Sequence, residues 1–486
     1  MLTLPYFKNE AAASGAVHNV ARHEDALANV LKKHGFQTGK LPSGIKRDDA
    51  LKWIKEPQLA SEIPNGTFIE QPFGTHASPD FIIKVSDKVI IFLEAKSAKG
   101  TSPMYNSGGI TQDFLYVFCS KKTNQTTIYM GSSMITLEQQ RLIDEHIEKA
   151  RMSIARHIEV QPEEVLFFAT GTEVNNTMLQ GVVFSSTEEV PHVVTTTIEH
   201  PSILEVCRSL EREGKATVTY IEPDSDGVVS PEEVKKALRM QTVLVTVMYV
   251  NNEIGTIQPI ASIARAVMSF KKEHGLKNLF VHTDASQAVC YEKIHIQALG
   301  VDMVTFDSIK MYGPRGCAVL VKRKNVLLAP LMYGGGQERG LRPGTENVPA
   351  IVSCAHAFTL AEREKERERL RVKKLQEYLI KEITERFPEA SINGSCERRI
   401  VNNVNVCFPR IDAEFAVIYL AEKGIACSYA SACRTQKETA SSYVLEAIGH
   451  TDCALSSLRV TLGKYTKKSD INYFLKHLTA FIHKYV

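Results

Sequence analysis

A lysine followed by a glycine-rich turn gives this chain one place for covalent chemistry. The residue is Lys310, which lies in the segment FDSIKMYGPRG (306–316) at the end of an expected strand. An amine held there can carry a cofactor aldehyde as a Schiff base. Because lysines beside glycines are also common on protein surfaces, this interpretation needs support from other segments.

Three further segments offer groups that could hold such a cofactor. Asp284, in VHTDASQ (281–287), ends an apolar run, and a carboxylate there can pair with a protonated pyridine nitrogen. The backbone N–H groups of TGTEVNN (170–176) and the Thr172 hydroxyl can hold a phosphate where a strand meets a helix. His200 can place an imidazole over a ring. The alternative for Asp284 is a helix cap.

In this order, the segments resemble those of the NifS/IscS-type cysteine desulfurases, class V aminotransferase enzymes of PLP fold type I. The resemblance runs from about Ala150 to the C-terminus and includes YVNNEIGTIQP (249–259), GGGQERGLRPGTENV (334–348) and SSLRVTLG (456–463). It implies that the chain binds pyridoxal 5'-phosphate (PLP). It also implies that L-cysteine is converted to L-alanine and that the sulfur stays on the enzyme as a persulfide.

The resemblance also implies the cofactor contacts. Lys310 would form the Schiff base and move the proton, Asp284 would pair with the pyridine nitrogen, and His200 would stack on the ring. Gln287 would bond the phenolic oxygen, with Asn252 close to it. The whole implied cofactor-binding set is Gly171, Thr172, His200, Asn252, Asp284, Gln287, Ser308, Lys310 and Thr345.

Four residues of this set would contact a phosphate group, one of them in a second subunit. Gly171, Thr172 and Ser308 would hold the phosphate of their own chain. Thr345 would reach the phosphate of the neighbouring subunit, so the resemblance implies a homodimer.

The substrate and its sulfur would be handled by the C-terminal part of the chain. Arg459 would bind the substrate carboxylate, a task that suits a bidentate guanidinium, and Asn252 would lie close to the substrate. Cys433, in SAC (431–433), would attack the substrate sulfur as a thiolate, which makes Cys433, Lys310 and His200 the implied catalytic residues. The alternatives are an inert packed thiol at Cys433 and a structural ion pair at Arg459.

The chain also departs from the family pattern. Ile309 stands where the family usually has a histidine before the lysine, and Ala430 stands where it has a glycine before the SAC segment. No match to the N-terminal segment of the family is visible. Cys427 is either an auxiliary thiol or a packing residue.

The first segment of the chain carries a second, independent pattern. SPDFIIKV (78–85) and VIIFLEAK (89–96) have the form PD-x13-ExK, and they resemble the PD-(D/E)xK restriction-endonuclease-like superfamily. Asp80, Glu94 and Lys96 would then be catalytic, with Asp80 and Glu94 as ligands of Mg²⁺ and DNA as the partner. The alternative is a surface hairpin with ordinary charges.

The first helix can add one more acid to this site. It is expected at 24–34, where Glu24 is either part of the site or a solvated residue. The apolar runs 81–85 and 89–93 predict a hairpin, and 116–119 and 126–130 predict two further strands.

From about 161 to 360, short apolar runs alternate with helical stretches, which predicts a doubly wound, mostly parallel α/β sheet. The expected strands are 165–169, 192–196, 217–221, 242–250, 279–283, 303–306 and 318–321. The expected helices are 136–158, 176–184, 202–213, 231–240, 259–274 and 361–387.

The length of 486 residues suggests about three domains at roughly 150 residues each. We predict an α/β PD-(D/E)xK nuclease-like domain at 1–135 and a PLP-binding large domain of fold type I at 136–365. A small α+β domain with the catalytic cysteine loop is predicted at 366–486.

Composition narrows the class of protein. Apolar residues make up 44% and charged residues 23%, which is typical of globular chains and argues against disorder. Neither a secretory signal nor a membrane span is visible, so we expect a cytoplasmic protein, without a membrane partner, whose ten cysteines are free thiols. The net charge of +3 lies entirely in the first 130 residues, which is compatible with DNA but too weak to argue for it.

The favoured function is therefore a PLP-dependent cysteine desulfurase fused to a nuclease-like domain, with an unidentified sulfur acceptor. One alternative is an Mg²⁺-dependent DNA endonuclease that uses a degenerate desulfurase-like dimer as a scaffold. The other is a catalytically inactive PLP-binding or interaction protein.

Overall fold

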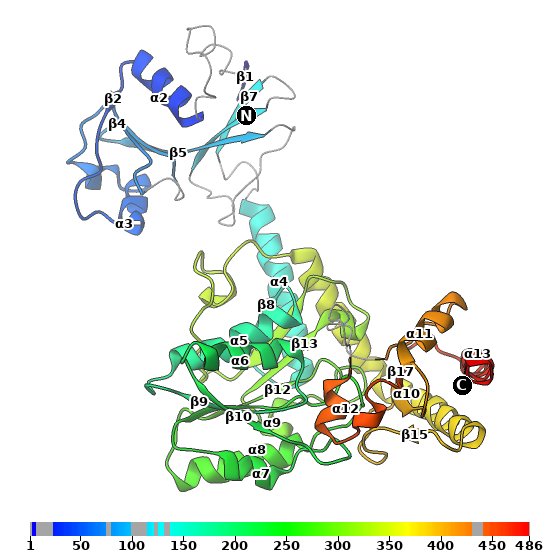
Figure 1. Cartoon of the computed structure of the whole chain (residues 1–486). Helices are drawn as coiled ribbons and strands as arrows, with labels where there is room; N and C mark the ends of the chain where they lie inside the picture. Colours follow the sequence, from blue (N-terminus) through cyan, green and yellow to red (C-terminus); the bar gives the residue numbers. More distant parts are fainter. Residues whose placement is uncertain are drawn as a thin grey trace. The chain divides into compact units, whose positions relative to one another are not determined.

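The computed structural model describes residues 2–5, 23–73, 79–98, 114–120, 125–130, 137–429 and 441–485. It divides the chain into two compact units, Met1–Glu145 and His146–Val486 (Figure 1). The division falls inside helix α4 (Leu137–Ile158).

The first unit is built on one mixed sheet, with strand order β1-β7-β6-β5-β4-β3-β2. The hairpin prediction is confirmed, because β4 and β5 pair antiparallel across a short turn. β5 then pairs parallel with β6, and β6 pairs antiparallel with β7. The strands are β1 (Leu2–Pro5), β2 (Gln37–Thr38), β3 (Thr67–Glu70), β4 (Phe81–Ser86), β5 (Val89–Ala98), β6 (Leu115–Ser120) and β7 (Gln125–Met130).

This sheet buries both faces because successive side chains alternate between them. Phe68, Phe81 and Leu93 lie in one cluster, together with Ala28 of helix α2 (His23–Lys33). Phe92 lies in a second cluster, with residues of α3 (Arg47–Leu51), η1 (Lys52–Ile54) and η2 (Pro57–Ala60). The unit is therefore an α/β layer structure.

The second unit is built on a larger sheet, with strand order β10-β9-β11-β12-β13-β14-β8. β10, β9, β11, β12 and β13 pair parallel, whereas β14 pairs antiparallel with both β13 and β8, so the prediction of a mostly parallel sheet is confirmed. The strands are β8 (Val165–Phe168), β9 (His192–Thr196), β10 (Thr217–Ile221), β11 (Thr242–Thr246), β12 (Phe280–Asp284), β13 (Met303–Asp307) and β14 (Ala318–Lys322).

Helices cover both faces of this sheet, as parallel strands require. α5 and α6 pack on one face around Val174, Met178 and Ile203, while α7 and α8 lie on the other (Figure 1). The helices are α5 (Gly171–Ser185), α6 (Pro201–Arg212), α7 (Pro231–Ala237), α8 (Ile260–Glu273) and α9 (Ile296–Leu299).

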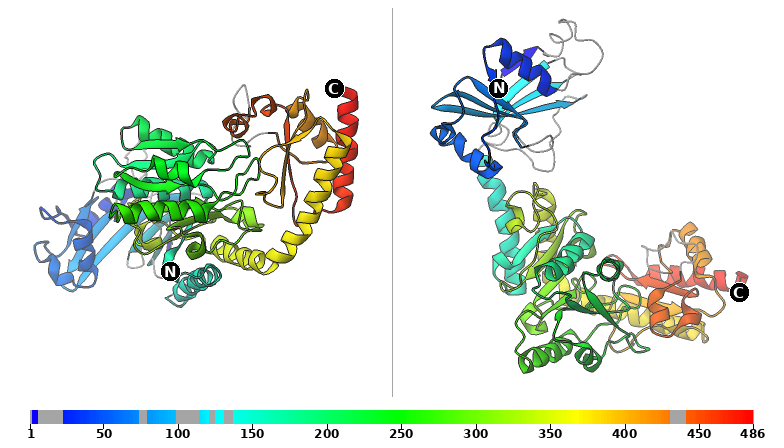
Figure 2. Two further views of the ribbon diagram at one scale, coloured as in Figure 1. Left: turned by 90° about the horizontal axis from the view of Figure 1, so that it is seen from below. Right: turned by 60° about the vertical axis from the view of Figure 1, so that its left-hand side comes forward.

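A smaller α+β part completes the second unit. Its antiparallel sheet has the order β15-β16-β17, with β15 (Ser391–Ile392), β16 (Asn403–Cys407) and β17 (Ser457–Thr461). Figure 2 shows the long helix α10 (Val348–Arg386) in yellow beside α13 (Lys468–Tyr485) in red. The remaining helices are α11 (Ala413–Glu422) and α12 (Tyr443–Ala447).

None of the described helices is long and apolar enough to cross a lipid bilayer.

Candidate active site

A cavity of about 600 Å³ lies where the large sheet meets the small antiparallel sheet of the second unit. Several residues singled out from the sequence line it together, although they come from segments far apart in the chain. They are Gly171, Thr172, His200, Asn252, Asp284, Gln287, Lys310 and Arg459.

Lys310 lies in η5 (Ser308–Met311), the short turn that follows strand β13. Asp307 caps this turn, because its Oδ1 accepts from the Ile309 N–H at 3.0 Å. The other oxygen of Asp307 accepts from the Gly171 N–H at 2.8 Å. The Asp307 carboxylate therefore links the turn that carries Lys310 to the start of α5. The Gly171 N–H, which was expected to face a phosphate, donates to Asp307 in this structure.

Asp284 ends strand β12 and accepts hydrogen bonds at both of its oxygens. Oδ1 accepts from the Ser286 N–H at 2.9 Å, and Oδ2 accepts from the Asn175 amide at 2.9 Å. Because both oxygens accept, the contacts fix the plane of the carboxylate at the cavity wall.

His200 is the N-cap of α6 and is half-buried at the cavity. Its Nδ1 accepts from the Ser202 N–H at 3.1 Å and lies 2.8 Å from the Ser202 hydroxyl. Burial lowers the pKa of His200. The neutral imidazole therefore has its Nδ1 engaged by Ser202, so its proton lies on Nε2.

The residue before it, Glu199, is completely buried. Its Oε1 accepts from the Met248 N–H at 2.9 Å and from the Thr196 hydroxyl at 2.8 Å. Burial raises the pKa of Glu199 to about 8. The residue that precedes His200 therefore carries a buried, neutral carboxyl group.

Arg459, on β17, is fixed by main-chain contacts. Its Nη1 donates to the Asn252 carbonyl at 3.0 Å, and burial lowers the pKa of the guanidinium. The side-chain Oδ1 of Asn252 is buried and has no hydrogen-bond partner within the described part of the chain. Arg459 and Asn252 thus form one polar corner of the cavity.

Two other predicted residues, Ser308 and Thr345, are described but do not line this cavity. Ser308 is buried beneath the turn, and its Oγ has no hydrogen-bond partner among the residues described. Thr345 is exposed and does not line the cavity. Cys433 and Ala430 lie outside the described residues.

The chain on either side of the Cys433 segment is anchored at this same corner. The main chain of Ser428 forms a β-bridge with Arg459. The hydroxyl of Ser442, which caps α12, donates to the carboxylate of Glu253, the neighbour of Asn252. Both flanks of the segment therefore meet residues adjoining the cavity.

The family model for class-V aminotransferases matches residues 124–474 of this chain. The chain belongs to the class-V aminotransferase family.

Individual relatives of this class-V aminotransferase agree. A cysteine desulfurase IscS from Dictyoglomus turgidum is 38% identical over 339 residues, which cover 70% of this chain and 84% of the relative. A solved NifS-like protein superposes with a TM-score of 0.65 at 33% identity, covering 71% of this chain and 90% of that one. A solved SspA in complex with cysteine superposes with a TM-score of 0.57 at 31% identity, covering 68% and 90%.

Membership in this family implies PLP, and the cavity of the class-V aminotransferase suits it. The donor set holds an amine, a fixed carboxylate and an imidazole, which are the groups that an aldehyde-bearing pyridine ring requires. The unpartnered oxygens of Asn252 and Ser308 are the kind of buried polar atoms that a bound ligand satisfies. A methyl group on Gly313 would come within 2.2 Å of the Ser308 Oγ, so the backbone beneath Lys310 leaves no room for a larger residue.

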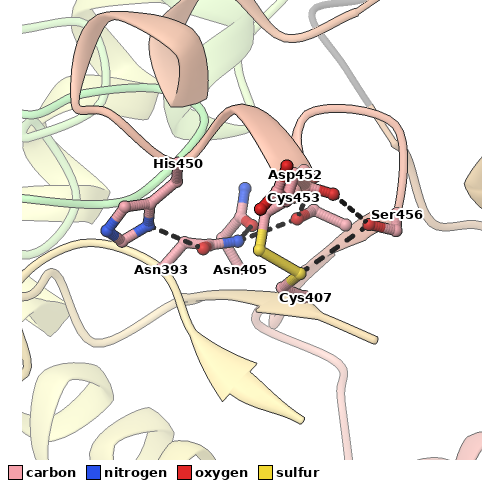
Figure 3. The surroundings of a disulfide bond; sticks show 8 residues. Asn393, Asn405, Cys407, His450, Asp452, Cys453 and Ser456 are labelled. Atoms are coloured by element: carbon pink, nitrogen blue, oxygen red, sulfur yellow. Dashed lines mark hydrogen bonds between the residues drawn. A yellow bond between two sulfur atoms is a disulfide. The ribbon is translucent and has the colours of Figure 1, made fainter. Parts of the chain in front are cut away.

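The expectation that all cysteines are free thiols is wrong for one pair. Cys407 of β16 and Cys453 of η7 (Thr451–Cys453) form a disulfide (Figure 3). Sequence spacing did not reveal it, because 46 residues separate the two cysteines and only the fold brings them together. The described free thiols are Cys207, Cys290, Cys317, Cys354, Cys396 and Cys427.

The nuclease-like residues of the first unit fall partly within the described region. Asp80 directly precedes β4, and its Oδ2 accepts from the Ala95 N–H of β5 at 2.7 Å. Glu94, the residue before Ala95, is buried. The side chains of Lys96 and Glu24 lie outside the description. Among the side chains that are described, no group of three or more His, Cys, Asp or Glu is placed to hold a metal ion.

Sequence reasoning missed two buried residues of the second unit. Asn175 donates to Asp284, and the buried Glu199 accepts from the Met248 N–H, yet neither was given a role. Asn175 lies in the TGTEVNN segment and Glu199 directly precedes His200, so proximity in sequence to predicted residues was the available signal.

Proposed function

We propose that this chain is a PLP-dependent cysteine desulfurase that converts L-cysteine to L-alanine and keeps the sulfur as a persulfide on Cys433. The observation that carries the proposal is the single cavity in which Lys310, Asp284, His200 and Arg459 meet. The identity to the IscS relative over most of the chain supports it.

PLP, when bound, supplies an electron sink that lets the carbon–sulfur bond of the substrate break. Lys310 would hold the cofactor and carry a proton at Nζ. Asp284 would face the ring nitrogen as a carboxylate, since both of its oxygens already accept hydrogen bonds. His200 would lie over the ring with its Nε2–H as the exchangeable proton, because Ser202 engages Nδ1.

The substrate would be held at the corner formed by Arg459 and Asn252. The guanidinium keeps donors for a carboxylate beside the one that it gives to the Asn252 carbonyl. The unpartnered Oδ1 of Asn252 is an acceptor for the substrate or the cofactor. An arginine suits this place because its planar fork matches a carboxylate bidentately.

In the proposed sulfur transfer step, Cys433 is the nucleophile. Its thiolate attacks the substrate sulfur, a sulfur–sulfur bond forms, and the carbon–sulfur bond breaks. The electron pair goes to the substrate carbon, which gains a proton to become alanine. The sequence places Cys433 five residues after Ser428, whose main chain pairs with Arg459.

The proposed assembly is a homodimer. Thr345 does not line the cavity of its own chain and is exposed, which suits a residue that serves a second subunit. Its role in the neighbouring phosphate site is part of the proposal.

Absorbance tests the cofactor assignment. Purified protein given PLP is expected to absorb near about 420 nm, and Lys310→Ala is expected to lose this band. Lys324→Ala is the matched control, because Lys324 is an exposed lysine whose Nζ lies 4.0 Å from Glu163, away from the cavity. A wild-type protein that stays colourless after PLP addition would refute the assignment.

The first unit carries a second candidate function, a metal-dependent nuclease that cuts DNA. The specific observation is the meeting of Asp80 with β5 beside the buried Glu94, which brings two carboxylates to adjacent strands. The two carboxylates would hold Mg²⁺, and the metal together with Lys96 would activate water.

Cleavage assays decide this second candidate. Mg²⁺-dependent cutting of duplex DNA is expected from the wild type and from Glu62→Ala, which changes an exposed acid of the same unit. Asp80→Ala is expected to abolish cutting. Persistent cutting by Asp80→Ala, or none by the wild type on DNA of varied sequence, would contradict the nuclease assignment.

A further inference from the structure

A series of hydrogen-bonded, buried side chains leads to Asp284 at the cavity wall. The Thr246 hydroxyl lies 2.8 Å from Nδ1 of His282, and Nε2 of His282 lies 3.1 Å from the Thr305 hydroxyl. Thr305 donates to the Asn175 Oδ1 at 2.8 Å. Each of these side chains is at most 2% exposed, so water cannot replace their contacts.

Asn175 is the branch point of this hydrogen-bonded series. Its Oδ1 accepts from Thr305, while its Nδ2 donates to Asp284 and to the Ser202 hydroxyl, both at 2.9 Å. A carboxylate can only accept, so the NH₂ side of the amide must face Asp284. Every hydrogen-bonding group of the amide except one lone pair is therefore engaged, and its orientation is fixed.

The donor and the acceptor in every hydrogen bond of this series follow from the orientation of the Asn175 amide. Because Thr305 gives its only hydroxyl hydrogen to Asn175, its oxygen must accept from His282 Nε2–H. Nδ1 of His282 must then accept from the Thr246 hydroxyl. Burial lowers the pKa of His282 to about 4, which keeps the imidazole neutral in this tautomer. In all four hydrogen bonds from Thr246 to Asp284, the donor is thus the residue farther from Asp284 along the series.

A second branch leads to His200. The Ser202 oxygen accepts from Asn175, so its hydroxyl hydrogen is directed to Nδ1 of His200 at 2.8 Å. The same Nδ1 also accepts from the Ser202 N–H. One amide thereby supports both the carboxylate and the imidazole that face the cavity.

We infer that Asn175 is a positioning residue that holds Asp284 against the ring nitrogen of the cofactor, with Thr305 and His282 fixing the Asn175 amide from behind. The inference rests on the proposed function, since it concerns the same cavity. It adds a residue that acts through Asp284 rather than on substrate. Its loss would weaken protonation of the ring nitrogen and slow the chemical step while leaving the Arg459 corner intact.

The test uses PLP labelled with ¹⁵N in the pyridine ring, bound to the full chain. In the wild type the nitrogen resonance is expected at the position of a protonated pyridine. Asn175→Ala and Asn175→Asp are expected to shift it toward the unprotonated position. Both are expected to lower kcat about 10- to 100-fold, the range for removing a hydrogen bond to a charged group, with the KM for L-cysteine nearly unchanged.

Two further variants keep the test decisive if Asn175→Ala does not fold. Thr305→Val preserves shape but removes the bond that orients the amide, so a smaller shift of the same sign is expected. Thr177→Val is the control, because Thr177 lies on the same helix as Asn175, is also buried, and within the described part of the chain its hydroxyl bonds only the Glu173 carbonyl.

Each outcome distinguishes the two proposals. If the wild type does not bind PLP, the proposed function fails. If the wild type binds PLP and the Asn175 variants keep a wild-type nitrogen resonance and kcat, the positioning role is refuted. Equal shifts in Thr177→Val and Thr305→Val would also refute it, because a general packing effect would then explain both.

Discussion

Arg459 donates from Nη1 to the main-chain carbonyl of Asn252 at 3.0 Å, while its own backbone pairs with Ser428. The contact joins the small antiparallel sheet to the segment after β11. It fixes a guanidinium at the cavity wall and ties it to the chain that leads toward Cys433. In the proposed reaction, the substrate carboxylate and the segment that carries Cys433 would thus be held at one corner of the cavity.

Replacing Arg459 by lysine is expected to weaken substrate binding. Lysine keeps the charge but loses the planar fork that binds a carboxylate bidentately. We expect the KM for L-cysteine to rise at least about 10-fold, since truncating one partner of a hydrogen-bonded charge pair costs roughly 2–5 kcal/mol. PLP affinity, measured by absorbance titration, should stay within about twofold. A loss of PLP affinity equal to the rise in KM would show that Arg459 supports the whole cavity instead.

Glu199 is expected to make stability fall with rising pH. The pKa of its carboxyl lies near 8 in the folded chain, above the ordinary value of 4.5. The contribution of the neutral carboxyl is therefore complete below about pH 4.5 and is lost as the pH rises through 8. Glu199→Gln imitates the neutral form, so its Tm at pH 8 should exceed that of the wild type by about 2 °C or more. Equal Tm curves across pH 5–8 would contradict a neutral Glu199.

Removing the disulfide is expected to destabilise the second unit. Cys407 and Cys453 are 46 residues apart, and closing a loop of that length stabilises by up to about 4 kcal/mol in the chain-entropy model. Cys453→Ser should lower the midpoint of denaturant unfolding under non-reducing conditions. The exposed Cys396→Ser should not. Two titratable thiols at Cys407 and Cys453 in the native, unreduced protein would show that the bond is absent.

Gly313→Ala is expected to impair PLP binding. A Cβ at Gly313 would meet the Ser308 Oγ at 2.2 Å and the Ser308 carbonyl oxygen at 3.0 Å, so the turn that carries Lys310 must shift. We expect at least about 10-fold weaker PLP binding by absorbance titration. Gly336→Ala is the matched control, because nothing lies within 4 Å of a Cβ there. Unchanged PLP affinity in Gly313→Ala would show that the turn tolerates the displacement.

Much of the α/β architecture could be predicted from apolar runs, but the residues at which the strands end could not always be predicted. β9 and β10 begin and end as expected. β11 ends at Thr246 rather than Val250, because the apolar residues after it are buried in a loop at the cavity. Hydrophobicity reports burial, and only pairing distinguishes a strand from a buried loop.

The start of α10 was missed for a different reason. The helix begins at Val348, where the Asn347 side chain caps it and Pro349 lies in its first turn. The sequence predicted a helix only from residue 361 onward. The capping signal was present in the sequence, but it lies inside a segment quoted for its resemblance.

The residues of the candidate site that carry reactive groups could be predicted from the sequence. The residues that only orient or support those groups could not. Lys310, Asp284 and Arg459 are recognisable by type and context. Asn175 and Glu199 gain their importance from burial and from hydrogen bonds between distant segments, which spacing along the chain does not encode. The nuclease-like assignment of the first unit stays a prediction.

The most direct test of the central claim measures the products of L-cysteine with the PLP-loaded full chain and a reductant. The wild type is expected to release alanine and sulfide in equal amounts over many turnovers. Cys433→Ser should keep the cofactor absorbance but release neither, while Cys427→Ser should remain active. Absence of alanine from the coloured wild-type protein, or undiminished release from Cys433→Ser, would contradict the account.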